Sequence, residues 1–127
     1  MLRESKAFSG FSVSDLEKSK AFYRDILGLE ISAPMEQLAE LHIEGGSKVI
    51  LYFKPDHVPA TFTVLNFPVK NLENTMEELR SRGVKFEIYK EAGFKTDENG
   101  ILKDQGMKIA GFKDPSGNIL SVLEDKE

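Results

Sequence analysis

The chain has 127 residues, of which 40% are apolar and 30% charged, as in an ordinary globular domain. Its net charge of −4 argues against a nucleic-acid partner, and its longest apolar run, Val49–Phe53, is too short to cross a membrane. The absence of cysteine excludes disulfides and thiol nucleophiles, and we expect a cytoplasmic protein.

The first half of the chain predicts a strand, a helix and three further strands. Residues Lys6–Val13 alternate as a strand does, and Ser14 with Glu17 forms a capping box that predicts the start of a helix. Gly28 suits the position after that helix, where a positive φ is common. The three strands that follow are expected near Leu29–Ser32, Leu38–Ile43 and Lys48–Lys54.

The second half predicts the same order of elements. A strand at Thr61–Val69 precedes an N-cap at Asn71, and a helix with an apolar stripe ends at Gly83. The stripe consists of Leu72, Met76 and Leu79, and strands are expected at Val84–Tyr89, Met107–Phe112 and Ile119–Glu124.

The two halves can be aligned as an internal repeat. Val13 aligns with Val69, an offset of 69 − 13 = 56, and Val49 aligns with Ile119, an offset of 119 − 49 = 70. The extra length in the second half fits within Lys90–Gly106. We therefore predict an α+β fold in which two tandem β-α-β-β-β modules form a curved, partly open mixed sheet around a cavity. Residues 1–127 are expected to form one domain, with modules at about 5–55 and about 60–125.

Two motifs resemble those of a known family. Ser12–Tyr23 followed by Leu27-Gly28-Leu29 is similar to the opening signature of the vicinal-oxygen-chelate superfamily, and Phe112–Leu120 is similar to its closing signature. This superfamily includes glyoxalase I, bleomycin-resistance proteins and extradiol dioxygenases. The resemblance implies the paired-module fold and a homodimer, and it adds no claim about the reaction.

In the family's metal enzymes, side chains on four strands hold a divalent metal that binds two neighbouring oxygens of the substrate. The resemblance places these four positions at residues that are poor ligands, and a shift by one residue adds at best a single phenol. We therefore predict that the usual metal site is absent, with no cofactor. The four positions are Phe8, Leu51, Val64 and Ser121.

Strand alternation predicts that an apolar cavity wall with a few polar groups binds an apolar or aromatic ligand. The expected ligand-binding residues are Phe8, Ser12, Leu51, Phe53, Val64, Asn66 and Ser121. The segment that begins at Tyr89 and Glu91 is expected to fold over the cavity mouth, and Phe94 within it favours docking onto an apolar surface. An alternative is that the apolar side chains fill the cavity themselves.

The leading hypothesis is a metal-free protein that binds small molecules, with no membrane or nucleic-acid partner and no assigned catalytic residue. One alternative is a glyoxalase-like or dioxygenase-like metalloenzyme with unconventional ligands such as Glu40, His42 or His57; Glu44 alternates with the first two along one strand. A second alternative is a degenerate module that serves only in oligomerisation. The poor ligand positions favour a protein that is not an enzyme.

Overall fold

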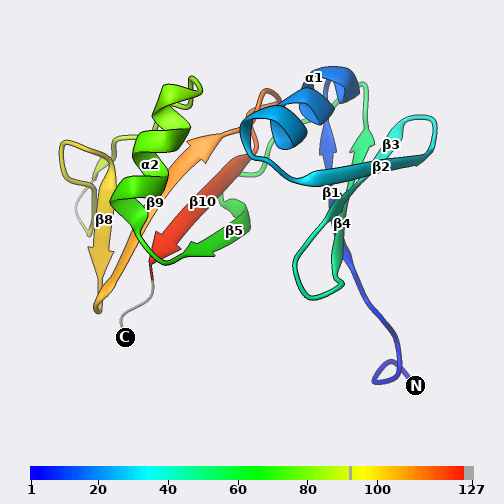
Figure 1. Cartoon of the computed structure of the whole chain (residues 1–127), viewed down its shortest axis with the longest axis horizontal. Coiled ribbons are helices and arrows are strands. Elements are labelled where there is room, and N and C mark those ends of the chain that lie inside the picture. Colours follow the sequence, from blue (N-terminus) through cyan, green and yellow to red (C-terminus); the bar gives the residue numbers. More distant parts are fainter. Residues whose placement is uncertain (92, 125–127) are drawn as a thin grey trace. The chain divides into compact units, whose positions relative to one another are not determined.

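A computed structural model describes residues 1–91 and 93–124, and the chain divides into two compact units, Met1–Val58 and Pro59–Glu127. Each unit contains its own four-stranded sheet and its own helix (Figure 1). Within the described ranges, no helix has the length and apolarity that a membrane span needs.

The sheet of unit 1 has the strand order β1-β4-β3-β2, with β1 and β4 parallel and the other neighbours antiparallel. The helix α1 (Leu16–Ala21) follows β1 and continues as a π-helical turn, η1 (Phe22–Ile26). The Phe11 ring on β1 contacts Tyr23, so the odd-numbered residues of β1 face this helix. The strands are β1 (Ser9–Val13), β2 (Glu30–Met35), β3 (Leu38–His42) and β4 (Lys48–Phe53).

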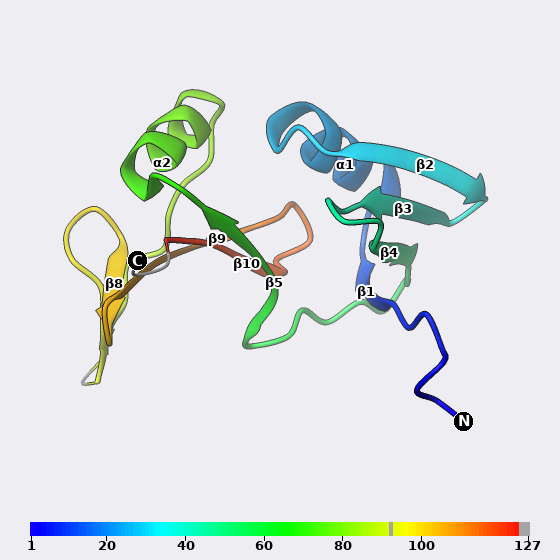
Figure 2. The same cartoon turned by 60° about the horizontal axis from the view of Figure 1, so that its bottom comes forward.

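Unit 2 repeats this topology with the strand order β5-β10-β9-β8. Its helix α2 (Leu72–Ser81) lies on one side of the sheet (Figure 2), and the predicted stripe of Leu72, Met76 and Leu79 is buried. The strands of this sheet are β5 (Thr63–Val69), β8 (Ile101–Asp104), β9 (Met107–Lys113) and β10 (Ile119–Glu124). A separate short hairpin consists of β6 (Lys90–Glu91) and β7 (Phe94–Lys95).

The predicted α+β class and the two β-α-β-β-β modules are confirmed, since each unit forms an open, mixed, four-stranded sheet. The internal repeat extends to the start of each helix. Asp15 accepts a hydrogen bond from the Lys18 amide at 3.0 Å, and Asn71, its equivalent in the second half, accepts one from the Asn74 amide at 3.0 Å. The predicted N-cap at Asn71 is therefore confirmed.

Two local predictions are wrong. The first helix is capped by Asp15 and not by Ser14, because the Asp15 carboxylate reaches the backbone amide three residues ahead. Residues 84–89 do not form a strand; Phe86 makes one isolated bridge to Phe112. The strand that pairs beside β9 is β8, which lies inside the stretch that the sequence assigned to the insertion.

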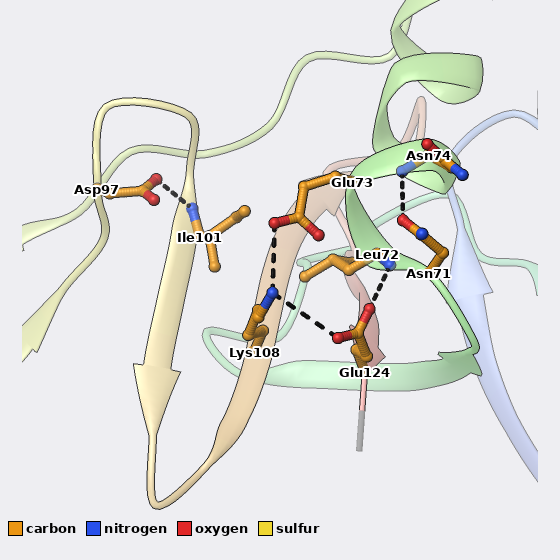
Figure 3. A network of polar contacts seen from close by, with 8 residues as sticks. All are labelled: Asn71, Leu72, Glu73, Asn74, Asp97, Ile101, Lys108 and Glu124. Carbon is orange, nitrogen blue, oxygen red and sulfur yellow. Dashed lines mark hydrogen bonds and ion pairs between the residues drawn. The ribbon is translucent and has the colours of Figure 1, made fainter. Parts of the chain in front are cut away.

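The start of α2 is bonded to the far end of its own sheet (Figure 3). Glu124, at the end of β10, accepts a hydrogen bond from the Leu72 amide at 2.7 Å. Lys108 on β9 lies 3.7 Å from the Glu124 carboxylate and 3.3 Å from that of Glu73. The pKa of Glu73 is lowered by its own backbone amide and by Lys108, and the pKa of Lys108 is raised mainly by Glu73. This network joins the helix to two strands.

Replacing Glu124 with alanine is expected to destabilise unit 2 by about 1 kcal/mol, because the amide of the buried residue Leu72 loses its acceptor. Urea denaturation followed by far-UV circular dichroism measures the change. Glu124→Gln is the matched control, since it keeps the acceptor for Leu72 and removes only the charge that faces Lys108. Equal stability of the alanine variant and the wild type would contradict this account.

Candidate functional site

The first family metal position, Phe8, lies just before β1 on the side of the sheet that faces away from α1. Its ring is 58% exposed and the Lys48 ammonium lies 4.8 Å from the ring centroid. Gly10 shares this face, since a Cβ placed there would stand 3.3 Å from the Ile50 Cβ. We call this side the open face of unit 1.

The second position differs from the expectation by one residue. Leu51 pairs with Phe11 and Ala39 and is 0% exposed, so it lies on the side of the sheet that faces α1. The register therefore places Leu51 and Phe53 opposite to the predicted face, and Ile50 and Tyr52 occupy the open face. Phe11 in unit 1 corresponds to Phe67 in unit 2, and their strand partners are Leu51 and Val122. Leu51 therefore corresponds to Val122, an offset of 122 − 51 = 71 and not the predicted 70.

In unit 2 the predicted residues Asn66 and Ser121 do share a face. They are register partners on β5 and β10, and the Ser121 hydroxyl donates to Asn66 Oδ1 at 2.5 Å. The register skips Val64, which is half-buried at an irregularity in β5. We call the side that carries Asn66 and Ser121, opposite α2, the open face of unit 2.

The family's metal does not fit these residues. With the corrected register, the four positions hold phenylalanine, isoleucine and valine side chains and one buried hydroxyl, and hydrocarbon cannot coordinate a cation. The full set is Phe8, Ile50, Val64 and Ser121.

The alternative metal ligands are engaged with other groups. Glu40 lies 3.8 Å from the Lys48 ammonium, and the ring nitrogens of His42 and His57 are bonded to Ser32 and Ser12. In the described part of the chain, no group of three or more histidine, aspartate or glutamate side chains is placed to hold a metal ion.

A row of polar groups crosses the open face of unit 2. Ser121, which is 1% exposed, pairs with Asn66 on one side and with Gly111 of β9 on the other. The Tyr89 hydroxyl oxygen lies 4.0 Å from the position that a Cβ would take at Gly111. Because Gly111 has no side chain, the Tyr89 hydroxyl can approach the sheet closely at this point. The row places an amide and a phenol on one surface, about two strand spacings (~10 Å) apart.

An aromatic pair stands at the end of this row. The rings of Tyr89 and Phe94 have centroids 5.0 Å apart, and the Phe94 ring is 47% exposed. Thr96 holds the base of the hairpin by bonds to both the amide and the carbonyl of Tyr89, at 3.0 and 3.3 Å. Burial, followed by the nearby carboxylates Glu87 and Glu91, raises the pKa of Tyr89 above its ordinary value of 10.0. Tyr89 is therefore a neutral hydrogen-bond donor at physiological pH.

The predicted site residues are divided between the two units. Asn66 and Ser121 are bonded in unit 2, whereas Phe8 and Ser12 lie on the open face of unit 1. Sequence reasoning placed Tyr89 in a covering segment but missed Gly111. The signal that could have found it is an isolated glycine within a strand pattern, which often marks a close approach of another group.

Comparison with known proteins agrees with this fold. A family model described as the Glyoxalase/Bleomycin resistance protein/Dioxygenase superfamily matches residues 9–122. A Bacillus subtilis (strain 168) protein, Uncharacterized protein YraH, is 25% identical over 126 residues, which cover 88% of this chain and 91% of that protein.

Two solved structures are similar in fold. TnmS3, an antibiotic binding protein from Streptomyces sp. CB03234, aligns with a TM-score of 0.65 at 22% identity, covering 94% of this chain and 96% of its own. The fosfomycin resistance protein FosX from Listeria monocytogenes aligns with a TM-score of 0.71 at 15% identity, covering 94% and 92%. Because the family model covers nearly the whole chain, this protein belongs to the glyoxalase/bleomycin resistance protein/dioxygenase superfamily.

Proposed function

We propose that this protein binds an apolar or aromatic small molecule without a metal ion, and that the open face of unit 2 is its principal contact. The observation that carries the proposal is the row from Asn66 to Tyr89 across the sheet of unit 2. The hydrocarbon side chains at the family's metal positions support the metal-independent part.

The groups in the row define the ligand's chemistry. Ser121 donates to the Asn66 carbonyl oxygen. We assign the Asn66 Nδ2 amide as the group that donates to the ligand. The neutral Tyr89 hydroxyl is a second donor, and the exposed Phe94 ring offers a stacking surface. A ring system with one or two carbonyl-type acceptors matches this arrangement.

The descriptions of two proteins with a similar fold support a role in binding small molecules. TnmS3 is described as an antibiotic binding protein and FosX as a fosfomycin resistance protein. We infer by analogy that this chain also binds a small molecule.

The test begins with the metal content of the whole chain purified without chelator, measured by plasma mass spectrometry before and after incubation with nickel, zinc, manganese and iron. The expected content is well below one equivalent. Aromatic carbonyl compounds are then screened for an increase in melting temperature, because a ligand that binds only the native state raises its apparent stability. A stoichiometric, tightly held metal would overturn the proposal.

Replacing Asn66 with alanine, or Tyr89 with phenylalanine, is expected to weaken a hit from this screen about tenfold, since each change removes one hydrogen bond worth about 1.4 kcal/mol. Isothermal titration calorimetry measures the affinity. Asn74→Ala, at an exposed position on α2, is the matched control and should leave the affinity unchanged. Unchanged affinity in both site variants would place the ligand elsewhere.

We also propose that the two units form a single domain, that the protein is a homodimer, and that it lies in the cytoplasm. The dimer is expected from the family, where oligomers with two-fold symmetry are common. Light scattering coupled to size-exclusion chromatography, which measures mass independently of shape, should give twice the 14.3 kDa of one chain.

A further inference from the structure

A serine and a histidine meet on the open face of unit 1, far from each other in the sequence. The Ser12 Oγ lies 2.6 Å from His57 Nδ1, and both residues are partly buried. Ser12 belongs to β1, whereas His57 belongs to the segment that follows β4. A hydroxyl within hydrogen-bond distance of an imidazole nitrogen has the geometry of a nucleophile beside its general base.

The segment that carries His57 is held close to Ser12 by backbone bonds. The Lys54 amide donates to the carbonyl of Val13 at 3.1 Å, and the His57 amide donates to the carbonyl of Lys54 at 3.0 Å. The imidazole is therefore positioned by a turn that is anchored on the residue next to Ser12, and not by a freely moving chain.

Exposed aromatic side chains lie near Ser12 on this face, with the Lys48 ammonium over the far ring, that of Phe8. Tyr52 is the register partner of Ser12 and is 42% exposed, and the ring of Phe8 is also exposed. Between them Gly10 contributes no side chain, and Ile50 lies beside it. A small apolar acyl group can rest on this surface with its carbonyl carbon at Ser12.

A second serine–histidine contact on the same sheet provides a comparison. The Ser32 Oγ lies 2.9 Å from His42 Nε2, but this contact is exposed and His42 pairs directly with Glu30 across the strands. Its longer distance and its exposure to water make it a poorer nucleophile–base pair.

We propose that Ser12 and His57 are a nucleophile and general base that react with esters of small apolar acids. The Ser12 Oγ forms a bond to the acyl carbon as its proton moves to His57 Nδ1, and the bond from that carbon to the leaving oxygen breaks as the proton passes to it. Water, deprotonated by the same imidazole, then cleaves the acyl-serine and restores both residues. The site lies in unit 1 and does not depend on the ligand contact proposed for unit 2.

The test uses the whole chain and a fluorophosphonate probe, which forms a phosphorus–oxygen bond with an activated serine and releases fluoride. Intact-mass and peptide mass spectrometry should locate one adduct on Ser12. Ser12→Ala should abolish the adduct, and His57→Ala should slow its formation about 100-fold, as for loss of a general base. Ser32→Ala and His42→Ala are the matched controls and should leave the rate unchanged.

A second measurement is independent of the serine chemistry. The chain contains no cysteine, so Ser12→Cys introduces its sole thiol. That thiol should react with iodoacetamide faster than the thiol of Ser32→Cys, and adding His57→Ala should remove the difference. The proposal is overturned if the wild type shows no adduct on Ser12, or if the Ser12→Cys thiol reacts at the same rate with and without His57.

Discussion

Replacing Leu51 with alanine is expected to lower the free energy of unfolding by about 3 kcal/mol, among the largest effects of any single truncation in unit 1. Leu51 is 0% exposed and lies between Phe11 and Ala39 on the side of the sheet that faces α1. Truncation would leave a cavity between packed strands and a helix, and such a site collapses only in part.

Phe8 is the control, because the sequence placed it in the same cavity wall as Leu51. Its ring is 58% exposed, so Phe8→Ala should cost less than about 1 kcal/mol despite the larger side chain removed. Urea titrations of both variants, followed by circular dichroism, measure the two values. If Leu51→Ala were no more destabilising than Phe8→Ala, the register of β4 described above would be wrong.

Replacing Asp114 with alanine should cost unit 2 about 3 kcal/mol, because alanine would leave buried donors without their acceptor in the turn between β9 and β10. The Asp114 carboxylate is 5% exposed and accepts hydrogen bonds from the amides of Ser116 and Asn118, both at 2.9 Å, and from the Asn118 side chain at 3.0 Å. Each unsatisfied donor costs about 1–3 kcal/mol.

Asp97 offers a matched comparison within the same unit. Its carboxylate accepts from the amides of Asn99 and Ile101, both at 2.9 Å, which is the same spacing along the chain (Figure 3 shows the bond to Ile101). Asp97 is exposed, so water can replace the acceptor and Asp97→Ala should cost about 1 kcal/mol or less. Thermal melts monitored by circular dichroism compare the stability of the two variants. Equal losses of stability would show that burial of the turn does not determine how much its hydrogen bonds contribute.

Much of the fold could be predicted because its signals are local. The N-cap at Asn71 and the stripe of Leu72, Met76 and Leu79 each depend on a few neighbouring residues, and the structure confirms them. The internal repeat followed from two short alignments, and the family membership agrees with the two motifs.

The facing of β4 could not be predicted in the same way. Val49–Phe53 is apolar at every position, so it carries no alternation that separates one face from the other. Pairing with the neighbouring strands determines which face each side chain occupies. Phe11 and Ala39, the partners of Leu51, place it on the side that faces the helix. The repeat offset chosen from the sequence missed the true register by one, and a one-residue shift moves every side chain to the other face.

The contacts of the candidate site were hidden for a different reason. Tyr89 reaches Gly111, and His57 reaches Ser12, from a distant part of the chain, so no short window of sequence contains either pair. Strand β8 was missed because Ile101–Asp104 is short and follows a polar, glycine-containing stretch. Its identity depends on pairing with β9 and not on its own pattern.

The hairpin formed by β6 and β7 can change in sequence and length independently of the four-stranded sheet. Thr96 closes its base on both backbone groups of Tyr89, and in the described part of the hairpin β6 and β7 pair with each other and not with the four-stranded sheet of unit 2. Residues between Tyr89 and Thr96 can therefore be exchanged, lengthened or shortened while the sheet keeps its strand order. The segment therefore suits loop grafting: libraries confined to it would vary the aromatic surface around Phe94 while the four-stranded sheet stays unchanged.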